Sequence, residues 1–227
     1  MLRTPDSITR LIDDLQSTDE FTRAQAAFAL GMLGEPAVEP LIKLLSSDDY
    51  TVRKRAAWAL GVIGQPALRA LLALADDDNP ALRIEAVRIL GVIGEARALN
   101  QLIHALTDPN PRVAQRAATA LGKSGDPRGF HPLLMALHHP SPDVRYAACG
   151  ALANLHIAEA IAPLEELSYE NIKTTSWGAS VADAARRAIQ EIQGALPRDA
   201  DTATEFSRLS ALLEKHQSQH KQGDGSR

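Results

Sequence analysis

Apolar residues recur along this chain with the spacing of amphipathic helices, in two alternating blocks. One block reads VRKRAAWALGVIG from Val52, and its copies centre on Leu30, Leu60, Leu90, Leu121, Leu152 and Ile189. The other block reads AVEPLIKLL from Ala37, and its copies lie between successive copies of the first. Apolar positions within each block fall at i, i+3, i+4 and i+7, the spacing of one helix face. The pattern predicts about six pairs of helices, with a repeat of 30 or 31 residues over most of the chain.

Residues that favour helix ends lie between these blocks. Glycine tolerates the left-handed conformation at a helix C-terminus, and proline fits the first turn of a helix. These two residue types mark the junctions at Gly34, Gly64, Gly94, Gly125, Pro36, Pro66 and Pro127. Polar residues that can cap the second helix stand at Asp19, Asp49, Asn79 and Asn110. Because no single pair can bury its apolar side, we expect the pairs to stack into an all-α solenoid.

The two blocks resemble the HEAT family, and most closely the HEAT-like repeats named after the phycobilisome lyases. The resemblance rests on VRKRAAWALGVIG and AVEPLIKLL with their copies, and it extends over roughly residues 5–193. It implies a right-handed superhelix of about six HEAT-like helix pairs whose second helices line the concave side. This repeat serves lyases, scaffolds, chaperone-like factors and regulators alike, so the resemblance defines the fold more closely than the function.

The repeat pattern stops near Gln193, and the remaining chain has a different character. The chain divides into a HEAT-like repeat domain at 1–193, a linker at 194–202, an amphipathic C-terminal helix at 203–216 and a disordered tail at 217–227. Within the third segment, Phe206, Leu209 and Leu213 share one helix face. This helix either caps the open end of the core or docks on a partner. The tail lacks apolar residues that could form a core.

Comparison of the units separates stacking positions from surface positions. Small or apolar residues stay constant at the columns of Val52, Ala56 and Leu60, which predicts that they form the core. The columns of Lys54, Arg55, Trp58 and Val62 vary, and their spacing puts them on one helix face. By the resemblance, that face lines the groove. The predicted partner-binding residues are Phe28, Met32, Lys54, Arg55, Trp58, Val62, Ile84, Arg88, Val92, Arg116 and Lys123.

Large apolar residues on this face indicate a partner, because exposed apolar patches are usually binding surfaces. The alternative is that Phe28 and Trp58 fold sideways and pack between repeats. A second candidate site is the insertion SYENIKTTSWG, in which Tyr169 and Trp177 are predicted to lie on a protruding loop. The alternative for this loop is that it shields the terminal repeat.

Charged residues bear on the class of partner. Basic residues on the predicted face form a stripe, at Lys54, Arg55, Arg88, Arg116, Lys123 and Arg187. Glu85, Asp183 and Glu191 interrupt this stripe, and the formal net charge of the chain is −4. A nucleic-acid partner is therefore not expected. An acidic protein surface fits the stripe better.

Other polar residues have structural interpretations. A recurring arginine at the start of the second helix, at Arg23, Arg53, Arg83 and Arg145, is expected to pair with loop acids of adjacent units such as Asp48, Asp78 and Asp108. The single cysteine, Cys149, occupies an alanine column and is expected to be buried. HEAT-type deoxyhypusine hydroxylases bind iron through His-Glu dipeptides. No histidine here precedes a glutamate, so no metal site is expected.

These observations favour a non-catalytic scaffold or assembly factor that binds another protein, without a cofactor. The sequence contains no phosphate-binding loop and no recognisable catalytic triad. The alternative comes from the resemblance to E/F-type phycobilin lyases, which implies binding of a linear tetrapyrrole by Phe28, Trp58, Arg55 and Arg88. One cysteine and no long apolar run predict a cytoplasmic protein without a membrane span. The sequence leaves the oligomeric state open.

Overall fold

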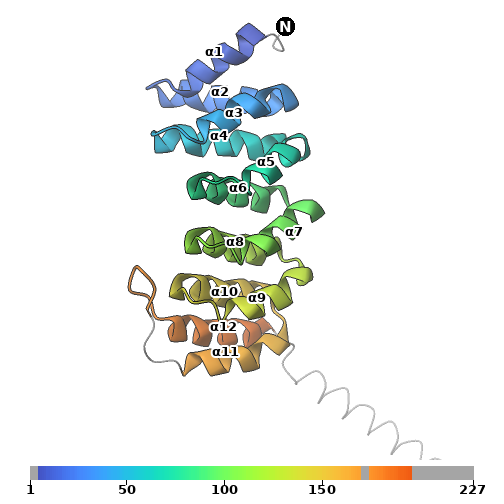
Figure 1. Ribbon diagram of the computed structural model, residues 1–227, viewed down its shortest axis with the longest axis vertical. Helices are drawn as coiled ribbons and strands as arrows, with labels where there is room; N and C mark the ends of the chain where they lie inside the picture. The colour runs from blue at the N-terminus through green and yellow to red at the C-terminus, as the bar shows by residue number, and fades with distance from the viewer. Residues whose placement is uncertain (1–4, 170–173, 196–227) are drawn as a thin grey trace, which may run out of the picture.

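A computed structural model describes residues 5–169 and 174–195, and these form an elongated stack of helix pairs (Figure 1). The first helices of the pairs are α1 (Pro5–Leu15), α3 (Val38–Leu44), α5 (Leu68–Leu74), α7 (Ala96–Ala105), α9 (Phe130–Ala136) and α11 (Ile161–Ser168). The second helices are α2 (Glu20–Leu33), α4 (Tyr50–Ile63), α6 (Pro80–Ile93), α8 (Pro111–Ser124), α10 (Pro142–Leu155) and α12 (Val181–Ala195). This arrangement confirms the predicted all-α solenoid of six helix pairs. The predicted C-terminal helix and tail, and most of the linker, lie outside the described residues.

The helices begin and end at the predicted residues. The carboxylate of Asp19 accepts a hydrogen bond from the Thr22 amide at 2.7 Å, and Asp49 accepts one from the Thr51 amide at 2.7 Å. Asn79 and Asn110 cap α6 and α8 in the same way. Caps of this kind are worth about 1 kcal/mol each. All four predicted glycines have positive φ, between 65° and 77°.

Short 3-10 turns connect several of the units. They are Glu35–Ala37, Gln65–Ala67, Pro127–Gly129 and Ala158–Ala160, and each leads directly into a first helix. The predicted helix-start prolines lie in the first three of these turns, where proline lacks only an amide that would have no partner. An isolated bridge joins Thr174 and Ser180, and the described part of the chain contains no strand.

The core lies between the first and second helices and continues along the whole stack. Val52, Ala56 and Leu60 of the constant columns are fully or almost fully buried, as predicted. The second helices pack against one another in one continuous row, whereas the first helices contact one another sparsely. The predicted partner-binding residues lie on the outward side of this row of second helices.

The recurring arginines differ from the prediction in their partners. Arg83 does form the expected pair, with both Asp108 oxygens at 2.8 and 2.9 Å. Arg23 and Arg53 instead donate to backbone carbonyls of the preceding loop in their own units, so their predicted pairing with acids of adjacent units was wrong. Arg145 donates to the carbonyl of His139. The loop carbonyls lie within reach of the arginine guanidinium whether or not an acidic side chain is nearby, so the guanidinium donates to them.

No single helix among the described residues is long and apolar enough to cross a membrane. Only the pair Tyr50–Ile63 and Gln65–Leu74, bent by 111°, passes the same length and composition test together.

Candidate partner-binding surface

The outward side of the second helices carries all the predicted partner-binding residues, and we call it the second-helix face. None of these residues is buried. Those that are exposed are Phe28, Met32, Lys54, Trp58, Val62, Val92, Arg116 and Lys123, and those that are half-buried are Arg55, Ile84 and Arg88. Phe28 and Trp58 keep 58% and 49% of their surface exposed, so neither ring is fully buried between repeats.

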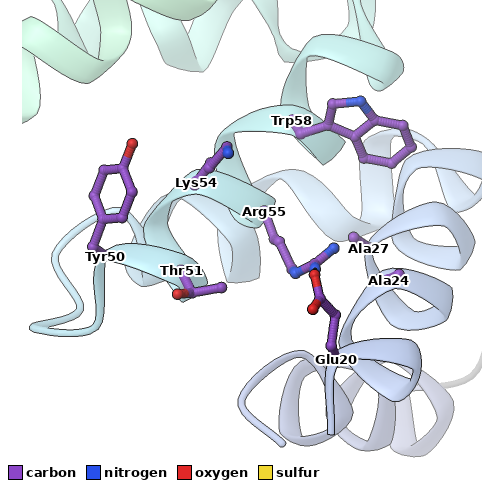
Figure 2. Close-up of a pocket in the computed structure, with 8 residues that line it drawn as sticks. All are labelled: Glu20, Ala24, Ala27, Tyr50, Thr51, Lys54, Arg55 and Trp58. Carbon is purple, nitrogen blue, oxygen red and sulfur yellow. The ribbon is translucent and has the colours of Figure 1, made fainter. Parts of the chain in front are cut away.

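A hollow of about 370 Å³ lies between α2 and α4 on this face (Figure 2). It is lined by Glu20, Ala24, Ala27, Tyr50, Thr51, Lys54, Arg55 and Trp58. Figure 2 shows the rings of Tyr50 and Trp58 at two sides, with Arg55 of α4 pointing towards Glu20 of α2. Of the predicted residues, the hollow brings together Lys54, Arg55 and Trp58. Phe28 is exposed on the same helix as Ala24 but does not line it.

The hollow exists because Ala24 is small. At the equivalent position the next four units carry longer side chains, at Lys54, Ile84, Gln115 and Tyr146. The neighbouring Ala27 belongs to a buried stacking column and forms the bottom of the hollow. A small residue in the first unit therefore leaves room beside the larger rings of the second.

Sequence reasoning missed Glu20 and Tyr50, which also line the hollow. Each lies one helical turn before a residue of the predicted face, Glu20 four residues before Ala24 and Tyr50 four residues before Lys54. The i, i+4 spacing was thus a signal for both. The predicted face began one turn too late along each helix.

Ion pairs reduce the predicted basic stripe to fewer exposed cations. Arg55 pairs with Glu20 at 3.1 Å across α2 and α4, and the guanidinium of Arg88 donates to Glu85 within α6. Lys54 on α4, Arg116 and Lys123 on α8, and Arg187 on α12 remain exposed. Between α4 and α8, the positive charge of the stripe thus lies on these two helices, with a neutralised α6 between them.

The predicted loop site joins the second-helix face at the other end of the stack. The ring of Trp177 meets that of Tyr146 edge-on, with centroids 5.6 Å apart at 81°. Arg187 donates to the Tyr146 hydroxyl at 3.0 Å. Ser176 holds the loop on α10 through two hydrogen bonds to Asp143, at 2.7 and 2.8 Å. Tyr169 is 80% exposed. Trp177 therefore extends the face at α10 and lies away from the hollow.

Candidate chemistry elsewhere in the described residues is limited. Burial raises the pKa of the Cys149 thiol to about 12, so the thiolate is scarce at neutral pH. This confirms the predicted buried cysteine. His104 and His131 are exposed on first helices, as predicted. Across residues 5–169 and 174–195, no group of three or more His, Cys, Asp or Glu side chains could hold a metal ion.

Comparisons with known proteins agree with this architecture. A family model described as HEAT repeats matches residues 8–81, 68–153 and 99–176. The chain is similar to the complex of CpcE and CpcF of phycocyanin lyase from Nostoc sp. PCC7120, with 26% identity and a TM-score of 0.57 over 69% of this chain and 98% of that chain. It is also similar in fold to a designed armadillo repeat protein in complex with the peptide (KR)4, with 23% identity and a TM-score of 0.50 over 82% of this chain and 99% of that chain. No curated protein matches the sequence.

Proposed function

This chain belongs to the HEAT-repeat family, and from that premise we propose that it is a non-catalytic scaffold or assembly factor that binds another protein on its second-helix face. HEAT arrays present extended surfaces to their partners because each unit contributes one helix to the same face. Here that face spans six second helices, from α2 to α12. The proposal assigns no cofactor and no catalytic residue to the chain.

One observation carries the proposal, namely the exposed apolar cluster on α2, α4 and α6. Its members are Phe28, Met32, Trp58, Val62 and Val92, of which even the least exposed, Val62, keeps 43% of its surface in contact with solvent. Leaving so many large apolar side chains on one face of a folded array is unfavourable unless a partner covers them. Trp is also among the residues that most often anchor protein interfaces.

Charge supports an acidic partner surface. Lys54, Arg116 and Lys123 are exposed on the face, while Glu20 and Glu85 are paired with arginines. The middle of the face is therefore positive even though the formal net charge of the chain is −4. Complementary charge speeds association and helps to exclude the wrong partners.

The test is a titration of purified variants against the partner captured with the wild-type chain. Trp58→Ala should weaken binding by about 2 kcal/mol, or about thirtyfold, because it removes a large anchor from the centre of the cluster. His131→Ala is the control, since His131 is exposed on α9, a first helix. If His131→Ala weakens binding and Trp58→Ala does not, the binding face has been assigned to the wrong side.

A second candidate function is the handling of a linear tetrapyrrole, as in the phycocyanin lyase complex to which this chain is similar. The hollow offers aromatic rings at Trp58 and Tyr50 and cations at Lys54 and Arg55, which suit the pyrrole rings and propionates of a bilin. A titration with biliverdin separates the two candidates. A shifted visible band that is lost in Trp58→Ala would favour tetrapyrrole handling, and an unchanged spectrum would favour the scaffold.

A further inference from the structure

The hollow between α2 and α4 has the form of a receptor for one apolar side chain. Ala24 and the buried Ala27 of α2 line it, together with Tyr50 and Trp58 of α4 (Figure 2). Its volume of about 370 Å³ is at the lower end of the roughly 300–1,000 Å³ typical of ligand sites. It is thus large enough for an aromatic or branched side chain but small for a whole folded element.

Charged residues around the hollow indicate the charge of the partner residues that lie beside that side chain. Lys54 lines the hollow and is exposed, whereas the nearest carboxylate, Glu20, is already paired with Arg55 at 3.1 Å. Further along the face, Arg116 and Lys123 are exposed on α8. On α6 between them, Arg88 and Glu85 neutralise each other. A chain that follows the face from the hollow therefore meets apolar surface first and positive charge afterwards.

The spacing of these features fits an extended peptide. Packed helices lie about 8–10 Å apart, so α8 is about 16–20 Å from α4, two helices further along the row. An extended chain advances about 3.3 Å per residue, which means that about six residues span this distance. Exposed Val62 on α4 and Val92 on α6 provide apolar contact on the way.

We propose that the hollow receives one large apolar side chain from an acidic segment of the partner protein, and that carboxylates about six residues away on that segment contact Arg116 and Lys123. This inference rests on the proposed scaffold function and adds the chemistry and length of the segment that is bound. The same arrangement disfavours a basic peptide, because its side chains would face Lys54, Arg116 and Lys123.

The experiment uses the full chain and a fluorescein-labelled synthetic peptide of about ten residues, with Phe near one end and a run of Glu near the other. Two matched peptides replace the Glu run by Lys, or the Phe by Ser. Fluorescence anisotropy should show binding of the Phe–Glu peptide that weakens with salt, at least tenfold weaker binding of the Phe-to-Ser peptide, and no binding of the Lys peptide.

Ala24→Ile tests the hollow itself. Isoleucine should fill the hollow. The repeat already accommodates isoleucine at this position, because Ile84 occupies the equivalent position in the third unit. We expect this variant to bind the Phe–Glu peptide at least tenfold more weakly, with an unchanged circular dichroism spectrum and melting temperature. Ala73→Ile is the matched control, since Ala73 is exposed on the first helix α5, away from the face. It should bind as the wild type does.

The cations are tested by Arg116→Gln combined with Lys123→Gln. This variant should bind the Phe–Glu peptide more weakly and with a flatter dependence on salt, because the screened attraction has been removed. Intrinsic fluorescence offers a second readout. In a Trp177→Phe background, Trp58 is the remaining tryptophan of the chain, and its emission should shift when the peptide binds.

Four outcomes would overturn the inference: equal binding of the Lys peptide, unchanged affinity of Ala24→Ile, equal competition by a single-stranded oligonucleotide, or self-association of the chain that Ala24→Ile abolishes. Its failure is distinguishable from failure of the scaffold proposal. If the peptides do not bind while Trp58→Ala still weakens binding of the captured partner, the acidic segment is wrong and the second-helix face remains the binding surface.

Discussion

At the scale of single residues, side-chain size decides both the packing and the site. Gly122 on α8 faces α10 so closely that an added Cβ would lie 2.6 Å from the Cβ of Ala151. Ala24 has the opposite effect, because its small side chain leaves the hollow open beside Trp58. The sequence predicted that small or apolar residues in constant columns form the core. It could not predict the hollow, because an alanine in a variable column leaves a hollow only where larger side chains surround it. The sequence does not show where the neighbouring rings lie.

The glycine contact gives a stability prediction with an internal control. Gly122→Ala should lower the free energy of unfolding by about 1–3 kcal/mol, because the new methyl group overpacks the contact between α8 and α10. Gly150→Ala should leave stability unchanged or raise it by up to about 1 kcal/mol, since alanine favours helix and nothing lies within 4 Å of its Cβ position. Urea unfolding of both variants measures the difference. Equal stability of the two would show that α8 and α10 are not so closely packed.

At the scale of helices, local sequence determined where the elements begin and end. Capping residues such as Asp19 and glycines such as Gly94 have the predicted positions because their interactions are local. The partners of the recurring arginines were predicted less well, since a guanidinium can reach several acceptors and only packing decides among them. Arg83 has the predicted carboxylate, and it connects α6 to the loop before α8 through Asp108.

This ion pair predicts a loss of stability that depends on pH. Burial raises the pKa of the Asp108 carboxyl, but the hydrogen bonds from Arg83 and from the Asn110 amide outweigh it and hold the pKa below its ordinary value. A carboxyl whose pKa is lower in the folded state stabilises the fold at pH values above the ordinary aspartate pKa of about 4. This contribution disappears as the pH falls through the folded-state pKa. Asp108→Asn should therefore cost about 1–3 kcal/mol at neutral pH.

Urea unfolding of Asp108→Asn and the wild type across the acidic range measures this effect. The difference in unfolding free energy should shrink as the pH falls below about 4, where the carboxyl of the unfolded chain takes up a proton, and should be lost once the pH is below the lower pKa of the folded state. A difference that stays constant from neutral to acidic pH would mean that packing, and not the charge of Asp108, is responsible.

At the scale of the whole molecule, the described chain is a row of similar units whose second helices share one exposed face. Repetition made this arrangement predictable, because six imperfect copies separate stacking columns from surface columns within one sequence. The contact between Trp177 and Tyr146 was not predictable in the same way. Trp177 lies in an insertion that has no counterpart in the other units, so no column of the repeat indicated where its ring would pack.

Site-specific photo-crosslinking tests most directly the claim that the second-helix face holds the partner. A photoreactive residue would replace Val62, which is 43% exposed on α4, and in a second protein Met135, which is 73% exposed on the first helix α9. Both proteins would be irradiated with the captured partner and compared on denaturing gels. The account predicts a covalent adduct from position 62 and none from position 135. An adduct from position 135 without one from position 62 would contradict it.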